Sequence, residues 1–97
     1  MPDNKEKIRL RSKKSRLKTK YNMTLLDFEN IMMLQNNKCP ICRCDFNELK
    51  DKDICVDHNH ETGKVRGILC RLCNVGIGCL KDDINILQLA IYYLNNN

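Results

Sequence analysis

Two Cys-x-x-Cys pairs constrain this chain more than any other feature. Cys39 and Cys42 form the first pair, Cys70 and Cys73 form the second, and residues 43–69 separate them. A turn of this kind directs two thiolates at one cation about 2.3 Å away, and two such turns complete a tetrahedral shell. The spacing therefore predicts one structural zinc ion that joins two distant segments. Because four sulfur ligands leave no open position, this zinc is not expected to take part in a reaction.

The size of the chain explains the need for such a metal. Its 97 residues include two Phe, three Tyr and no Trp, so the apolar core should be small. Seven cysteines cannot all pair as disulfides, which favours a reducing, intracellular setting with metal-bound thiolates. No segment resembles a signal peptide or a membrane span of ~20 apolar residues. We therefore expect a cytoplasmic protein without membrane contact.

Three other residues are alternative candidates for zinc ligands. Cys44 is near enough to Cys42 to compete, but the Cys-x-Cys spacing is cramped for one metal. His58 and His60 could also serve, since residues two apart share a strand face, but this would leave two cysteines of a complete set unused. The two remaining cysteines, Cys55 and Cys79, are expected to be small buried hydrophobic residues.

Positive charge is concentrated near the N-terminus. Residues 1–20 contain nine of the 17 Lys and Arg but only two of the 12 Asp and Glu. Such a segment is typical of proteins that bind phosphate backbones, although a solvated charged tail has the same composition. We therefore divide the chain into a basic DNA-binding arm, residues 1–20, and a zinc-stabilised domain, residues 21–97. The expected DNA-contacting side chains are Lys13, Lys14, Arg16, Lys18, Lys20, Lys64, Arg66 and Arg71.

The arm and the residues after it have different patterns. The arm has too few apolar positions for a buried face, so it is expected to be helical on DNA and frayed without it. Thr24 and Asp27 form a capping box, which predicts a helix over residues 24–36 with a core-facing apolar stripe. Residues 45–52 are polar and predict a loop.

The second half of the chain predicts a hairpin and two helices. Strands at residues 54–57 and 65–69 are joined by a turn at 61–64. A short helix begins at Cys70 and is expected to break near Gly76 and Gly78. Asp82 or Asp83 is expected to cap a last helix. Its inward face should consist of Ile84, Leu87, Ala90, Ile91 and Leu94.

The two histidines of the chain, His58 and His60, lie directly after Asp57. Imidazole can take a proton from water near neutral pH, and an adjacent carboxylate can hold a divalent cation. Asn74 follows the last zinc ligand at once, and its amide oxygen suits a hard cation such as Mg²⁺. Neighbouring residues of a regular strand face opposite sides, so Asp57 and His58 can share a site only if the strand ends or kinks there. We predict this irregularity.

The resemblance to a known family rests on three stretches. They are Cys39-Pro-Ile-Cys42, Val56-Asp-His-Asn-His60, and Gly63-Lys-Val-Arg-Gly-Ile-Leu-Cys70-Arg-Leu-Cys73-Asn74. Together with the flanking helices, over about residues 21–94, they resemble the phage recombination endonuclease VII family of HNH, or His-Me finger, nucleases. The resemblance implies a small α+β fold, in which helices flank a zinc-stapled ββα-metal unit. The founding enzyme forms a dimer through a longer C-terminal helical region, which leaves a homodimer open here.

The resemblance also implies roles for individual residues. The four paired cysteines match structural zinc ligands, and Asp57 and Asn74 match ligands of a catalytic Mg²⁺ or Mn²⁺. His58 matches the general base, and His60 matches a further active-site histidine. These roles imply a metal-dependent DNA endonuclease, encoded by a phage or mobile element, that leaves a 5′-phosphate.

Two other interpretations use the same cysteines. A non-catalytic zinc-knuckle protein that binds nucleic acid also explains the basic arm, but it gives Asp57, His58 and Asn74 no common purpose. A zinc-stabilised interaction or regulatory subunit predicts no dependence on a divalent metal.

Overall fold

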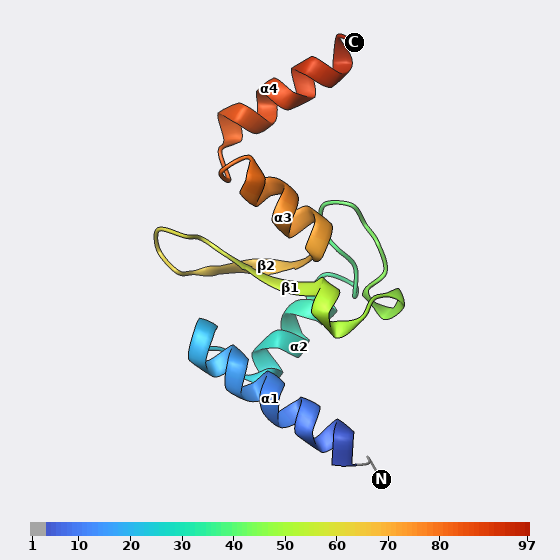
Figure 1. The fold of residues 1–97 in the computed structure, drawn as a ribbon, viewed down its shortest axis with the longest axis vertical. Coiled ribbons are helices and arrows are strands. Elements are labelled where there is room, and N and C mark those ends of the chain that lie inside the picture. The colour runs from blue at the N-terminus through green and yellow to red at the C-terminus, as the bar shows by residue number, and fades with distance from the viewer. Residues whose placement is uncertain (1–3) are drawn as a thin grey trace.

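A computed structural model describes residues 4–97, with side chains from residue 11 onward. The molecule is elongated, with dimensions of 55 × 30 × 21 Å, and a β-hairpin lies at its middle (Figure 1). Helices α1 and α2 lie on one side of the hairpin, and α3 and α4 extend from the other (Figure 1). The described residues form four α-helices and one two-stranded antiparallel sheet, so the expected small α+β class is confirmed.

Helix α1 runs from Asn4 to Tyr21, so most of the basic segment is helical. Leu17, near its end, is only 4% exposed and belongs to the core. Tyr21 packs partly against the same core. The expectation that this segment has no buried face was therefore wrong. A single leucine on the side of α1 that faces the core is enough to anchor the helix. The small number of apolar residues in this segment does not reveal such a contact.

Helix α2, Leu25–Leu34, begins with the predicted capping box. The Thr24 hydroxyl accepts a hydrogen bond from the Asp27 amide, and the Asp27 carboxylate accepts one from the Thr24 amide, both at 3.0 Å. These bonds satisfy backbone donors that the helix leaves unpaired. Hydrogen bonds from the Thr24 backbone and then its hydroxyl lower the pKa of Asp27.

Gln35, just after α2, fastens this helix to the hairpin. Its Oε1 accepts a hydrogen bond from the Ile68 amide at 2.9 Å, and its Nε2 donates one to the Ile68 carbonyl at 2.8 Å. The side chain thus pairs with the strand edge as a neighbouring strand would. The approach is close, because a Cβ added to Gly67 would lie 3.0 Å from the same Oε1 atom.

The hairpin consists of β1, Ile54–His58, paired antiparallel with β2, Val65–Cys70. Pairing is regular as far as Asp57, and the register then shifts before His58, which leaves Arg66 without a partner in β1. The predicted irregularity between Asp57 and His58 is confirmed. The extra residue at this irregularity, Arg66, belongs to β2, and β1 itself stays paired as far as His58.

Asn59 shapes the hairpin turn. Its side-chain oxygen accepts hydrogen bonds from the amides of Glu61 and Thr62, at 2.8 and 3.1 Å. Gly63 completes the turn with a φ of 75°, a conformation that costs glycine little. The turn therefore depends on local chemistry, as the sequence indicates.

Helix α3, Arg71–Cys79, packs against both strands and continues through Gly76 and Gly78. The predicted break at these glycines was wrong. A glycine costs a helix interior about 1 kcal/mol relative to alanine, which is too little to end a helix that packing supports. The chain turns instead at Lys81 and Asp82, which adopt left-handed φ values of 61° and 53°.

Helix α4, Ile84–Asn95, begins at the predicted cap, because the Asp83 carboxylate accepts two backbone hydrogen bonds there. Its predicted inward face was wrong. Ile84, Ile91 and Leu94 are 71%, 59% and 72% exposed, and the helix points away from the hairpin (Figure 1). Its apolar periodicity predicts a helix correctly but does not say what, if anything, covers it.

The core lies where α1, α2, β2 and the first cysteine pair meet. Its buried side chains are Leu17, Met23, Phe28, Cys39, Phe46, Ile68, Leu69 and Cys70. The predicted loop at 45–52 contains two short 3-10 helices, η1 (Phe46–Glu48) and η2 (Asp51–Asp53), and Phe46 is only 2% exposed. None of the helices in the described residues is long and apolar enough to cross a bilayer.

Candidate active site

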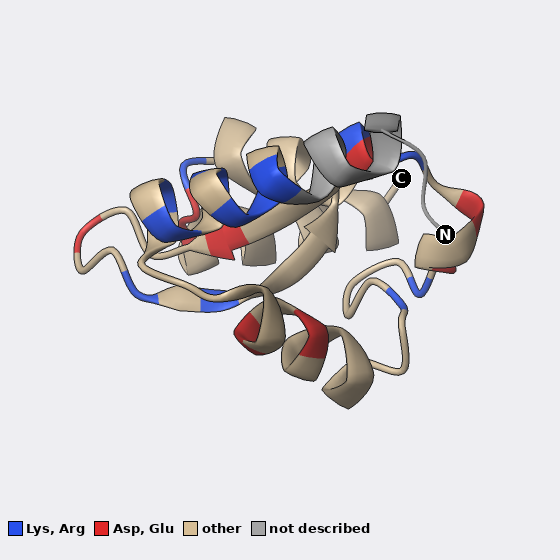
Figure 2. Cartoon of the chain, turned by 90° about the horizontal axis from the view of Figure 1, so that it is seen from below, with Lys and Arg blue, Asp and Glu red and all other residues tan. Residues whose placement is uncertain are grey.

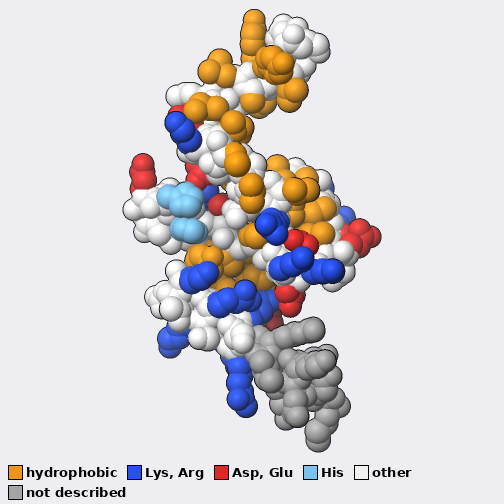
Figure 3. Space-filling view, viewed as in Figure 1, with side chains coloured by type: hydrophobic (Ala, Val, Ile, Leu, Met, Phe, Trp, Pro, Cys, Tyr) orange, Lys and Arg blue, Asp and Glu red, His pale blue; other side chains and the backbone are white. Residues whose placement is uncertain are grey.

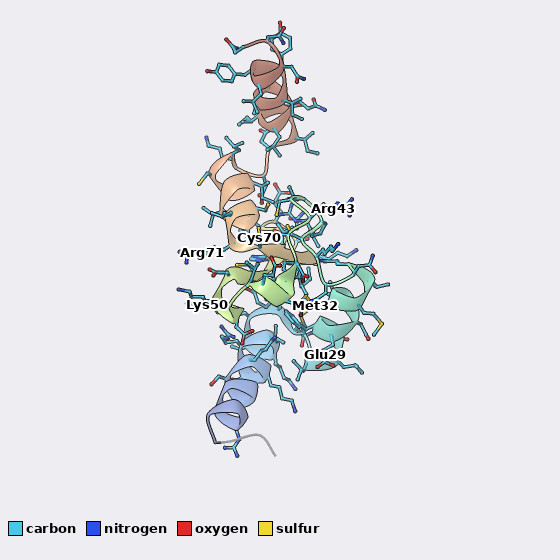
Figure 4. The ribbon with its side chains drawn as sticks, turned by 90° about the vertical axis from the view of Figure 1, so that its right-hand side faces the viewer. Glu29, Met32, Arg43, Lys50, Cys70 and Arg71 are labelled. Atoms are coloured by element: carbon cyan, nitrogen blue, oxygen red, sulfur yellow. The ribbon has the colours of Figure 1, made fainter. Side chains whose placement is uncertain are left out.

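The four predicted zinc ligands lie together. The Sγ atoms of Cys39, Cys42, Cys70 and Cys73 are all within 4.8 Å of one another, and those of Cys42 and Cys70 are 3.6 Å apart. Zn–S bonds of about 2.3 Å in a tetrahedron place sulfur atoms about 3.8 Å apart. The donor set therefore fits a metal such as zinc. Figure 4 shows Cys70 where β2 meets α3, near the middle of the molecule.

Backbone amides of the first pair point at its sulfur atoms. Burial disfavours the Cys39 thiolate, but hydrogen bonds from the amides of Cys70, Cys42 and Ile41 lower its pKa to about 6. The pKa of Cys42 is also lowered, mainly by the amide of Cys44. Because the thiolate is the form that binds metals, these amides prepare the pair for a cation.

The other cysteines do not belong to this group of four. Burial, together with the neighbouring sulfur atoms, raises the pKa of Cys44 to about 12, so it stays a thiol beside the cluster. Cys55 is half-buried in β1. Cys79 is exposed, so its expected burial was wrong, because the end of α3 projects beyond the core.

His58 and His60 lie together at the end of the hairpin, and Asp57 directly precedes His58 in β1. Asp57 is 8% exposed and is the one buried charged side chain within residues 11–97. The ring centroids of His58 and His60 are 4.8 Å apart in an edge-to-face arrangement, and the Tyr21 ring lies 5.6 Å from that of His58. Figure 3 shows the two histidines side by side at the surface. The alternative in which they complete the zinc shell is wrong, because the cluster consists of cysteines alone.

Arg66 compensates the buried carboxylate. Its Nε and Nη2 donate hydrogen bonds to the two oxygens of Asp57, both at 2.8 Å, and this contact raises the pKa of Arg66. The same Nη2 lies 3.3 Å from Oδ2 of Asp82, and Nε2 of His60 lies 3.5 Å from that oxygen. A polar chain thus runs from the hairpin to the connection between α3 and α4.

Asn74 lies in the first turn of α3, against β1. It lines a cavity of about 240 Å³ between α1, η2 and β1, together with Cys55. Cys55 and Asp57 are two residues apart and so share one face of the strand. Among the described residues no hydrogen bond joins Asp57 to Asn74, and both carboxylate oxygens accept hydrogen bonds from Arg66. That Asp57 and Asn74 share a metal therefore stays a prediction.

The predicted DNA contacts fall into separate groups. Lys13, Arg16 and Lys20 line the same cavity as Asn74, and Figure 2 shows basic residues spaced along α1. Arg66 is held by two carboxylates. The exposed remainder consists of Lys14, Lys18, Lys64 and Arg71. Their binding to DNA stays a prediction.

The sequence pattern of the recombination endonuclease VII family matches residues 14–96. This chain belongs to that family. Two similar proteins are each called Gene 59 protein. The one from Mycobacterium phage D29 is 41% identical over 81 residues, which is 82% of this chain and 48% of the relative. The one from Mycobacterium phage L5 is 37% identical over 83 residues, which is 84% of this chain and 49% of the relative. The chain spans about half the length of these relatives, and no solved structure matches it.

In this member of the endonuclease VII family, two residues at the candidate site were not identified from the sequence. Tyr21 ends α1 and contacts His58, but no local pattern marks it. Asp82 reaches His60 and Arg66, whereas the sequence suggested it only as a helix cap. Asp83 alone caps α4. The presence of a second carboxylate next to the cap, that of Asp82, was the one feature of the sequence that could have indicated a different role for it.

Proposed function

We propose that this chain is a metal-dependent DNA endonuclease that hydrolyses phosphodiester bonds at the end of its hairpin. One observation carries the proposal: at the register shift of the hairpin, the half-buried His58 directly follows the buried carboxylate of Asp57 in β1, and its ring contacts that of His60. Membership of the endonuclease VII family supports the same activity.

In this proposal β1, β2 and α3 form a ββα-metal, or His-Me finger, unit. Helix α3 packs on both strands, and Cys70 and Cys73 at its start connect it to the first cysteine pair. A zinc ion on the four cysteines would hold these parts in a fixed relation. It would have a structural role only, because its shell is complete.

Asp57 and Asn74 would hold a Mg²⁺ or Mn²⁺ ion. The fit rests on the carboxylate of Asp57, which is buried and now compensated by the guanidinium of Arg66, so the site accepts positive charge. Asn74 adds a neutral oxygen donor of the kind such ions prefer. The bound ion would stabilise negative charge on the phosphate and on the leaving 3′ oxygen. Arg66 would then keep its contact with Asp82.

His58 would act as the general base. In its neutral form one ring nitrogen takes a proton from the attacking water, and the ring is steadied by its contacts with Tyr21 and His60. The side chain of His60 is 70% exposed and so can meet the substrate. We assign it to the orientation of the phosphate. The products would carry a 5′-phosphate.

A plasmid assay tests this proposal. Supercoiled DNA should be nicked with Mg²⁺ or Mn²⁺ and left intact with EDTA. His58→Ala should slow cleavage by about 10² or more, the usual contribution of a general base, while zinc content and DNA binding persist. His60→Ala is the matched variant, and it should weaken cleavage less. Cleavage that survives in His58→Ala would favour the non-catalytic zinc-knuckle interpretation.

DNA is the proposed partner, and the interior of a phage-infected cell is the proposed setting, since the two similar proteins are phage proteins. A homodimer stays a prediction. Sedimentation analysis of the zinc-loaded protein would determine its oligomeric state.

A further inference from the structure

A basic cleft lies beside the candidate active site. We call the cavity of about 240 Å³ between α1, η2 and β1 the α1 cleft. Four basic side chains line it, against the single acidic side chain of Asp51. They are Lys13, Arg16 and Lys20 of α1, and Lys52 of η2. None of the four forms an ion pair with a side chain that the structure describes, so the cleft keeps a positive charge.

The packing of α1 fixes which basic residues face the cleft. Residues 13, 16 and 20 lie on one side of a helix, and Leu17 beside them is buried in the core. The ammonium group of Lys13 sits 4.0 Å above the centre of the Phe28 ring, which restrains it further. Arg11, Lys14 and Lys18 have the same spacing on the opposite side and do not line the cleft.

Two residues connect the α1 cleft to the candidate active site. Asn74, a proposed metal ligand, is part of its wall. Tyr21 is also part of the wall, and its ring lies 5.6 Å from that of His58. A polynucleotide strand that is cut at His58 therefore passes close to the cleft. The charge of the cleft matches that of the phosphates along such a strand.

We propose that the α1 cleft is a subsite for backbone phosphate of the strand that is cut, next to the phosphate that reacts. That this strand is cut rests on the proposed nuclease function, but the binding of phosphate in the cleft can be tested alone. The cleft positions the strand so that the scissile phosphate meets His58. The opposite face of α1 contributes only general attraction, which depends on charge and not on position.

Two triple variants with the same change in charge test the binding. One carries Lys13→Gln, Arg16→Gln and Lys20→Gln, and the other carries Arg11→Gln, Lys14→Gln and Lys18→Gln. Binding of a labelled duplex is measured in EDTA at several salt concentrations. The cleft variant should bind at least tenfold more weakly, and its plot of log K against log [salt] should be less steep by about 1 to 2. The other variant should change affinity less than threefold. Equal losses would overturn the proposal.

A second pair of variants avoids changes to α1. Lys52→Gln removes a cleft charge from η2, whereas Lys50→Gln removes an exposed charge that does not line the cleft. Only Lys52→Gln should weaken binding, by about threefold or more, and unchanged binding would count against the cleft. This pair decides the matter if a triple variant fails to fold.

Substituted DNA tests the position of the subsite. A neutral methylphosphonate one or two nucleotides from the cut should slow cleavage by the parent protein. It should not slow the triple cleft variant further, because the lost contact is the same. Independent, multiplicative losses would overturn the proposed position. If no variant or parent cleaves DNA, the nuclease proposal fails, while the binding measurements still decide whether the cleft holds phosphate.

Discussion

Replacement of Arg66 by Gln should make the candidate catalytic site bind divalent cations more tightly. The guanidinium donates two hydrogen bonds of 2.8 Å to Asp57, so it occupies both oxygens that a metal ion would use. A cation that binds Asp57 must displace the guanidinium from these oxygens. It is also repelled by the positive charge of Arg66. Glutamine keeps a polar but shorter side chain, and it removes both the charge and the fork of donors.

The expected size of the effect follows from the same contacts. A hydrogen bond between charged groups contributes about 1.5–3 kcal/mol. The lower end applies here, because the Arg66 side chain is 37% exposed and Asp82, 3.3 Å away, holds it after displacement. If the cation no longer has to break a contact that contributes about 1.5 kcal/mol, its dissociation constant should be roughly tenfold lower.

Calorimetric titration of the zinc-loaded protein with Mn²⁺ would measure this constant. DNA is omitted, because Arg66 was also expected to contact phosphate. Lys64→Gln is the matched control, since it removes an exposed positive charge from the same hairpin, and it should change the constant less than twofold. Asp82→Asn should act in the opposite direction, because Arg66 loses its second partner. If Arg66→Gln bound Mn²⁺ no more tightly than Lys64→Gln, the competition argument would be refuted.

Three further predictions concern stability. Cys70→Ser should lose zinc and helical circular dichroism together, whereas Cys44→Ser should keep both, and metal analysis would distinguish them. Gln35→Ala should lower the free energy of unfolding by about 1–3 kcal/mol in urea titrations, because two hydrogen bonds to a half-buried strand edge are lost; the exposed Asn30→Ala should change it little. Asp27→Asn should be less stable than the parent at neutral pH. Since the folded pKa of Asp27 is lowered, its contribution is lost as pH falls through that pKa, and the two unfolding curves should then converge; a constant difference would contradict this cause.

Features with local causes were predicted well from the sequence. The capping box of Thr24 and Asp27, the cap at Asp83 and the strands of the hairpin depend on neighbouring residues. The cysteine cluster joins distant segments, but metal-ligand spacing identifies it because the geometry of one ion restricts the choices.

Features that depend on distant packing were predicted poorly. The burial of Leu17 and Phe46 is set by partners far away in the sequence. The exposed face of α4 shows the reverse case, since periodicity records an apolar stripe but not its neighbour. Arg66 was expected at a phosphate, and only the folded chain shows that two carboxylates hold it. Such contacts can be identified only when the whole fold is known.

The burial of Leu17 in the core has a consequence for truncation experiments. A fragment that starts after residue 20 would lose a core side chain together with the basic residues of α1, so weaker DNA cleavage in it would report damaged folding as much as lost charge. A fragment that starts at residue 11 keeps that anchor. The same helix provides both a side chain that anchors it in the core and the positive charges. Only point substitutions on the surface of the helix can separate the two contributions.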